Sequence, residues 1–145
     1  MITRGITKND FDTIVAVLDR WFGGPAGQRA QPYFFYEFGE HALIAEEDGE
    51  LVGFLLGFIA EGPPRTGYVH LVGIHPDHRR RSVGKLLYLQ FAERAKAAGA
   101  ARIKAITTVG NEGSTSFHRA LGFDAVEDPS YAGEGRARIV FTRAL

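Results

Sequence analysis

The chain is organised around one segment, Val72-Gly73-Ile74-His75-Pro76-Asp77-His78-Arg79-Arg80-Arg81-Ser82-Val83-Gly84-Lys85-Leu86-Leu87. An apolar run ends at Pro76, a short basic loop follows, and an amphipathic run opens at Gly84, so the segment predicts a strand, a loop and a helix. The first N–H groups of a helix have no partner within the helix and lie at the positive end of its dipole. The segment therefore predicts an anion-binding turn of the kind that holds phosphate.

Three consecutive arginines, Arg79, Arg80 and Arg81, stand just before the predicted helix. Their charge opposes the helix dipole at this end unless an anion is bound, and a sequence selected for stability alone favours Asp or Glu there. The small residues Ser82 and Gly84 allow a ligand oxygen to reach the backbone. A solvated basic loop that caps the helix is the alternative, but the order of the residues favours a pyrophosphate site.

Length and composition describe an ordinary globular chain. Its 145 residues suffice for a core, and residues 1–145 are expected to form a single domain. The 17 Lys and Arg residues balance 17 Asp and Glu residues, which argues against nucleic acid or an anionic membrane as the partner. Cysteine is absent, which excludes disulfides, thiolate metal sites and cysteine nucleophiles, and no metal is expected. Without a signal peptide or a long apolar run, a cytoplasmic location is expected.

The first part of the chain predicts a strand and two helices. Residues Met1 to Ile6 form the strand, and Asn9 or Asp10 caps a helix that ends at Gly23-Gly24-Pro25. The aromatic segment from Pro32 to Phe38 predicts a second, short helix. Core packing is the favoured role of its rings, and a substrate-pocket wall or a dimer contact is the alternative.

A β-hairpin is predicted next. Its strands run from His41 to Glu47 and from Leu51 to Ala60, with Asp48-Gly49 at the turn. Gly53 and Gly57 interrupt the second strand and predict a bulge or a close approach of another backbone.

The rest of the chain predicts one parallel crossover. The strand from Gly67 to His75, the helix from Gly84 to Gly99 and the strand from Arg102 to Thr107 form a right-handed parallel unit. The remaining elements are a helix from Asn111 and strands at Asp124–Val126 and Arg138–Arg143. The pattern predicts an α+β fold, layered α/β/α, whose mixed and mainly antiparallel sheet has a central parallel crossover.

Two motifs make this sequence resemble the Gcn5-related N-acetyltransferase (GNAT) family. Arg79 to Gly84 is similar to the family's Arg/Gln-x-x-Gly-x-Gly/Ala signature, with Ser82 in place of the first glycine and Val72 to Pro76 as the usual lead-in. Asn111 to Phe123 resembles its Asn-x-x-Ala-x-x-Phe-Tyr-x-x-x-Gly-Phe pattern, with His118 in place of the tyrosine. The resemblance implies the acyl-CoA N-acyltransferase fold, and transfer of an acetyl group from acetyl-CoA to a primary amine by direct attack in a ternary complex.

The resemblance also implies which residues bind acetyl-CoA. Backbone groups from Val72 to Ile74 would pair with the pantetheine amides, and an N–H near Gly73 or Ile74 would stabilise the oxyanion. Amides from Arg80 to Lys85 would hold the pyrophosphate, with the arginine and lysine side chains adding charge. The full set of implied cofactor contacts is Val72, Gly73, Ile74, Arg79, Arg80, Arg81, Ser82, Val83, Gly84, Lys85, Asn111, Ser114 and Phe117.

Two histidines are the catalytic candidates. His118 stands where the family often has a tyrosine that protonates the departing thiolate, but an ordinary imidazole is only about a quarter protonated at pH 7. It would need a carboxylate to raise its pKa, or it would only position the sulfur. His70 is the candidate base, in period-two register with Val72 and Ile74. A histidine hydrogen-bonded within the sheet is the alternative for His70.

Other base candidates act through water: Glu37, Glu46, Glu47 and Tyr68. The predicted acceptor is a small-molecule amine, and a protein N-terminus or lysine is the alternative acceptor. A non-catalytic acyl-CoA-binding or sensing domain is a further alternative, because His118 replaces the tyrosine. A nucleic-acid contact is disfavoured, because basic residues are not interleaved with aromatic ones. The family often dimerises, and Trp21-Phe22 is a candidate contact surface.

Overall fold

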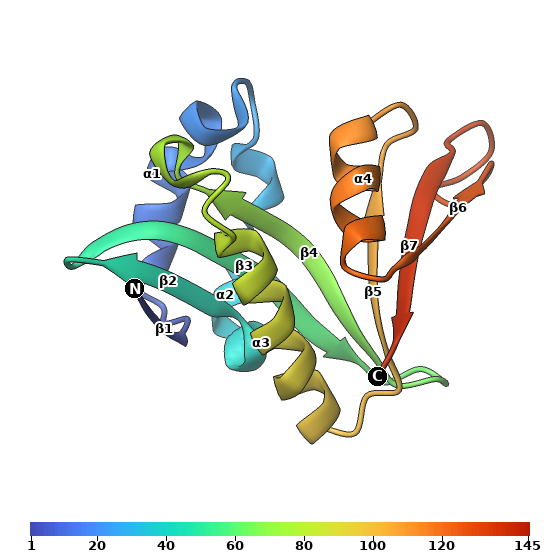
Figure 1. The fold of residues 1–145 in the computed structure, drawn as a ribbon, viewed down its shortest axis with the longest axis horizontal. Coiled ribbons are helices and arrows are strands. Elements are labelled where there is room, and N and C mark those ends of the chain that lie inside the picture. Colours follow the sequence, from blue (N-terminus) through green and yellow to red (C-terminus); the bar gives the residue numbers. More distant parts are fainter.

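The computed structural model describes residues 1–145, which form a seven-stranded sheet with helices on both faces (Figure 1). The strand order is β1-β2-β3-β4-β5-β7-β6, and only the β4–β5 pair is parallel. The strands are β1 (Ile2–Gly5), β2 (Leu43–Glu47), β3 (Glu50–Ala60), β4 (Thr66–Ile74), β5 (Arg102–Thr107), β6 (Asp124–Asp128) and β7 (Arg138–Ala144). The predicted α+β fold with one parallel crossover is confirmed.

The helices are α1 (Asp10–Phe22), α2 (Tyr33–Tyr36), α3 (Val83–Ala97) and α4 (Glu112–Ala120). Single turns of 3₁₀ helix occur at η1 (Gly27–Arg29), η2 (Gly39–His41) and η3 (Pro76–His78). None of the helices has the length and apolar character needed to cross a membrane.

Polar residues fix the start of helix α1, and a glycine ends it. Of the two predicted caps, Asn9 and Asp10, the Asn9 side chain makes no capping hydrogen bond. Asp10 instead accepts a hydrogen bond from the Thr7 N–H at 2.7 Å and two from the Arg4 guanidinium at 2.8 Å, which fix the first turn. Gly23 ends the helix in the left-handed conformation with φ 71°, as the sequence predicts.

Two apolar cores lie on opposite faces of the sheet. Leu87, Phe91 and Ala95 of α3 pack on one face, and Ile14 and Leu18 of α1 pack on the other. Figure 1 shows α3 crossing in front of the sheet, with α1 and α2 behind it. These apolar stripes follow the helical period of the sequence.

The aromatic residues near α2 are divided between core and surface. Phe34 and Phe35 are buried, which confirms core packing for these two, while Phe38 is 47% exposed. Trp21 is buried and stacks on Phe54 with ring centroids 6.0 Å apart. Trp21 therefore cannot contribute to the predicted Trp21-Phe22 dimer contact, since its ring belongs to the core, whereas Phe22 is 37% exposed and remains a candidate contact.

A β-bulge in the β3–β4 pair redirects His70. Leu56 pairs with Leu71 and Gly57 pairs with Val69, so His70 is the extra residue on β4. Gly57 is the predicted bulge glycine, and a Cβ there would lie 2.9 Å from the Phe91 ring. The bulge breaks the alternation of side chains that a regular strand would show.

The predicted register of His70 with Val72 and Ile74 is consequently wrong. Val72 and Ile74 pack against the core under α3. The His70 ring stacks on Phe34, in the opposite core, with centroids 3.9 Å apart.

Strands β4 and β5 pair at only one end. Their register covers Thr66 to Tyr68 on β4 and Arg102 to Lys104 on β5. Figure 1 shows the two strands diverging beyond this short ladder. The β4 edge from Val69 to Ile74 therefore faces β5 without a partner strand, and the sheet is open at its centre.

Candidate functional site

Three adjacent cavities line this opening. The loop cavity (about 430 Å³) lies at the start of α3, and the central cavity (about 340 Å³) lies between β4, β5 and α4. The outer cavity (about 320 Å³) lies beside η1, the end of β5 and the start of β7. The loop and central cavities share Ile74, Gly84 and Phe117. The central and outer cavities share residues that include His70 and Asn111. Together they form one groove across the sheet.

The loop cavity is built from the basic segment before α3. Arg80 and Ser82 adopt left-handed conformations with φ 67° and 62°, so Ser82 takes the backbone shape that a glycine would take more readily. The consecutive N–H groups from Arg80 to Lys85 make no hydrogen bond within the protein. Free N–H groups at the start of a helix, in a turned loop, are suited to bind an anion.

The three arginines differ in what their side chains contact. Arg79 donates a hydrogen bond to the Trp21 carbonyl oxygen. Arg81 pairs with Glu47 at 3.3 Å and lies 2.8 Å from the His78 ring nitrogen. Arg80 makes no hydrogen bond or ion pair within the protein and lines the loop cavity. Of the basic side chains predicted to add charge, Arg80 and Lys85 are thus the two without another partner.

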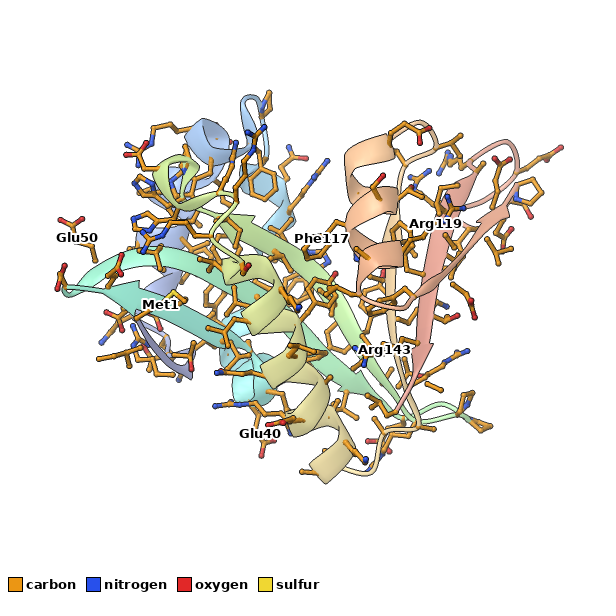
Figure 2. The ribbon with its side chains drawn as sticks, viewed as in Figure 1. Met1, Glu40, Glu50, Phe117, Arg119 and Arg143 are labelled. Carbon is orange, nitrogen blue, oxygen red and sulfur yellow. The ribbon has the colours of Figure 1, made fainter.

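Phe117 connects the two helices that border the groove. It lies on the side of α4 that faces α3 (Figure 2), and a Cβ on Gly84 would meet its ring at 3.3 Å. Gly84 therefore allows α4 to approach the first turn of α3. Val72 and Ile74 line the central cavity, whereas Gly73 lies over the Phe54 ring in the opposite core.

His118 and Tyr88 form a buried pair at the central cavity. The Tyr88 hydroxyl and His118 Nε2 are 2.6 Å apart, and His118 Nδ1 lies 2.7 Å from the Ser114 carbonyl oxygen. A carbonyl oxygen only accepts, so Nδ1 carries the proton and Nε2 accepts from Tyr88. The imidazole also stacks on Phe141 at 3.9 Å.

This environment does not suit His118 to act as an acid. Burial lowers the pKa of His118 by more than the hydrogen bond to Ser114 raises it, so the ring is neutral at pH 7. Neither ring nitrogen contacts a carboxylate, and both are already hydrogen-bonded. Burial also raises the pKa of Tyr88, which keeps its hydroxyl protonated. His118 therefore orients Tyr88 and is poorly placed to donate a proton itself.

His70 is held differently. Its Nε2 lies 2.6 Å from the Arg29 carbonyl oxygen, so Nε2 is the donor and Nδ1 is left as an acceptor in the neutral ring. Burial lowers the pKa of His70, and its side chain lines both the central and the outer cavity. A neutral imidazole with one free nitrogen, fixed at its other nitrogen, is suited to accept a proton.

A comparison with protein families decides the relationship. The sequence model of the family described as Acetyltransferase (GNAT) family matches residues 11–123 of the chain. These residues include the basic loop, His70 and α4. The chain belongs to the GNAT family.

Several known proteins resemble the chain in sequence or in fold. The L-2,4-diaminobutyric acid acetyltransferase of Virgibacillus pantothenticus is 32% identical over 51% of this chain and 46% of its own length. The chain spans about half the length of the curated relatives it matches. Ard1 from Thermoplasma volcanium has a TM-score of 0.80 at 16% identity, covering 99% of this chain and 97% of that one. The ribosomal-protein-S18-alanine N-acetyltransferase of Escherichia coli has a TM-score of 0.78 at 14% identity, covering 99% and 92%.

Within this GNAT domain, the predicted site residues of α4 lie together. Asn111 caps α4 through its side-chain oxygen, which accepts from the Ser114 N–H at 3.2 Å, and its amide donates to Thr107 at 3.1 Å. Asn111, Ser114 and Phe117 all line the central cavity. The predicted start of this helix at Asn111 is confirmed.

The base candidates that would act through water are separated from one another. Glu46 pairs with Arg4 and Glu47 with Arg81, and neither lines the groove. Glu37 lines a different cavity. Tyr68 lines the outer cavity, where burial raises its pKa to about 12.

Tyr88, Arg29 and Arg138 are among the groove residues that sequence reasoning missed. Tyr88 follows Gly84 by one helical turn, a spacing that indicates the same face of the helix. Arg29 and Arg138 had no comparable signal, because they come from a 3₁₀ turn and a strand end that only the fold brings together.

Proposed function

We propose that this GNAT domain transfers the acetyl group of acetyl-CoA to a primary amine of a small molecule, in a ternary complex. The observation that carries the proposal is the continuous groove from the anion-binding turn before α3 to the neutral His70. Family membership and the diaminobutyric acid acetyltransferase relatives support it.

The residues of the groove fit acetyl-CoA. The unpaired N–H groups from Arg80 to Lys85 suit a pyrophosphate, with Arg80 and Lys85 adding charge. The open β4 edge from Val69 to Ile74 suits an arm that carries amides, because it offers backbone groups as a further strand would accept them. When bound, acetyl-CoA supplies the thioester whose acetyl group is transferred.

His70 has a defined task in this reaction. A bond forms between the amine nitrogen and the acetyl carbon, the carbon–sulfur bond breaks, and the amine loses a proton. That nitrogen becomes strongly acidic as its new bond forms, so the free Nδ1 of His70 can accept the proton despite its lowered pKa. The departing thiol has an ordinary pKa of about 8.5, so it leaves as a thiolate without a strong acid.

A binding domain without transfer activity is the second candidate function. It is favoured by one observation, the burial of a neutral His118 at the position of the expected acid. Calorimetric titration with acetyl-CoA, followed by a thiol-release screen over primary amines, separates the two functions. Binding with thiol release supports the transferase, binding without release for any amine supports the binding domain, and no binding contradicts both.

A further inference from the structure

The outer cavity has a charge that the proposed transfer reaction does not require. We infer that the amine acceptor also carries a carboxylate, which binds between Arg29 and Arg138. The inference rests on the proposed function and names the chemical class of its acceptor, an amino acid with a primary amine to be acetylated.

The first observation is an excess of positive charge. The outer cavity is lined by nine residues, of which Arg29 and Arg138 are cationic and none is Asp or Glu. His70, in the same cavity, is neutral at pH 7 because burial lowers its pKa. The chain as a whole has no net charge, so this local excess is not a general property of its surface.

The second observation is that neither arginine is neutralised by the protein. Arg29 makes no ion pair, and Arg138 donates only to the Ala137 carbonyl oxygen, at 2.8 Å. Asp128 pairs with Arg138 in the β6–β7 ladder, but its carboxylate accepts from the Ser130 N–H at 3.0 Å and makes no ion pair. Two guanidinium groups without a carboxylate partner are suited to bind one from a ligand.

The third observation links this charge to the proposed base. The Arg29 carbonyl oxygen holds His70 Nε2 at 2.6 Å, and the Arg29 charge contributes to the lowered pKa of His70. One residue therefore fixes the base and places a cation beside it. If the reacting amine lies at His70 and the carboxylate lies beside Arg29, only a few bonds can separate the two groups of the acceptor.

This arrangement disfavours two other acceptors. A polyamine would bring further positive charge toward Arg29 and Arg138, which costs free energy where water is partly excluded. A protein N-terminus has no carboxylate near its amine unless the adjacent side chains are acidic. An amino acid satisfies both the charge and the size of a cavity of about 320 Å³.

The test compares acceptors that differ only by the carboxylate. Thiol release is measured with saturating acetyl-CoA for 2,4-diaminobutyric acid against 1,3-diaminopropane, and for ornithine against 1,4-diaminobutane. We expect kcat/KM to be about tenfold or more higher for the amino acid than for the diamine. Arg29→Gln and Arg138→Gln should each raise the KM for the amino acid about tenfold and leave kcat little changed. Arg119→Gln, an exposed arginine outside the groove, is the matched control and should change neither.

The outcomes separate this inference from the proposed function. The inference is overturned if kcat/KM is equal or higher for the diamines, or if the ratio of kcat/KM between amino acid and diamine is unchanged in both variants. Either result leaves the proposed transferase function intact. Absence of thiol release with every amine contradicts the transferase. The inference is then decided by calorimetry with the amino acids in the presence of CoA: binding that is lost in Arg29→Gln and Arg138→Gln supports it, and no binding overturns it.

Discussion

The Tyr88 hydroxyl donates a hydrogen bond of 2.6 Å to His118 Nε2 and so joins α3 to α4 beside the central cavity. The His118 ring is held from its other nitrogen by the Ser114 carbonyl oxygen, at 2.7 Å. Both side chains are buried, so each is the other's only hydrogen-bond partner at these atoms. The pair therefore has a structural role that can be measured apart from activity.

Removal of either partner should destabilise the protein. Tyr88→Phe leaves His118 Nε2 unpaired in the core, and we expect the free energy of unfolding to fall by about 1–3 kcal/mol. In Tyr88→Phe/His118→Phe the loss should be smaller than the sum of the two single losses, because no polar group is then left unpaired. Urea unfolding of the four proteins gives the coupling energy, and strict additivity would contradict the pairing.

His70 should determine the acid limb of the pH profile. Since burial lowers its folded-state pKa, kcat/KM should rise with pH through a midpoint below 6.5, where the ring loses its proton and becomes able to act as a base. His70→Gln keeps a donor for the Arg29 carbonyl oxygen but cannot accept the proton. We expect kcat to fall about 10²- to 10⁴-fold and the acid limb to disappear.

If His70 serves only to make a structural hydrogen bond, the expected result is different. In that case His70→Gln would retain nearly full kcat, because glutamine still donates to the Arg29 carbonyl oxygen. Steady-state kinetics of this one variant between pH 5 and about pH 9 distinguish the two roles.

The basic side chains of the loop should contribute unequally to acetyl-CoA affinity. Arg80→Ala and Lys85→Ala remove side chains without another partner, and each should weaken binding about tenfold, the effect of one lost charge-assisted hydrogen bond. Arg81→Ala is the control, since its side chain is paired with Glu47 and should affect affinity less. Calorimetric titration tests this order, and an equal loss for all three variants would refute it.

The left-handed conformation of Ser82 should be relieved by glycine. With φ at 62°, the serine Cβ is strained, and Ser82→Gly should raise the free energy of unfolding by about 1 kcal/mol without loss of acetyl-CoA affinity. Ser116→Gly, at an exposed position within α4, is the control and should lower stability by about 0.5 kcal/mol. A destabilised Ser82→Gly protein would show that the serine hydroxyl has a role in the loop.

Local patterns were sufficient to predict most of the fold and the loop cavity of the groove. Helix α3 follows from the spacing of Leu87, Phe91 and Ala95, and the ends of α1 and α3 follow from the glycines after them. Such features depend on interactions within a few residues, so neighbouring positions predict them. The basic loop is similar in kind, because a helix N-terminus and its anion-binding N–H groups are local features. Its free N–H groups from Arg80 to Lys85 follow the sequence prediction closely.

Only the tertiary structure decided the orientation of His70, the state of His118 and the charge of the outer cavity. The bulge opposite Gly57 arises where the Phe91 ring meets β3, and it turns His70 toward Phe34 instead of the side that alternation predicts. His118 acquires its partner from a different helix, 30 positions earlier in the chain. Arg29 and Arg138 are distant in sequence and meet at one cavity. The sequence by itself determined which segments are strands and helices and which turn offers free N–H groups, because those properties are local. Side-chain direction, protonation and shared charge depend on contacts between distant residues, which only folding creates.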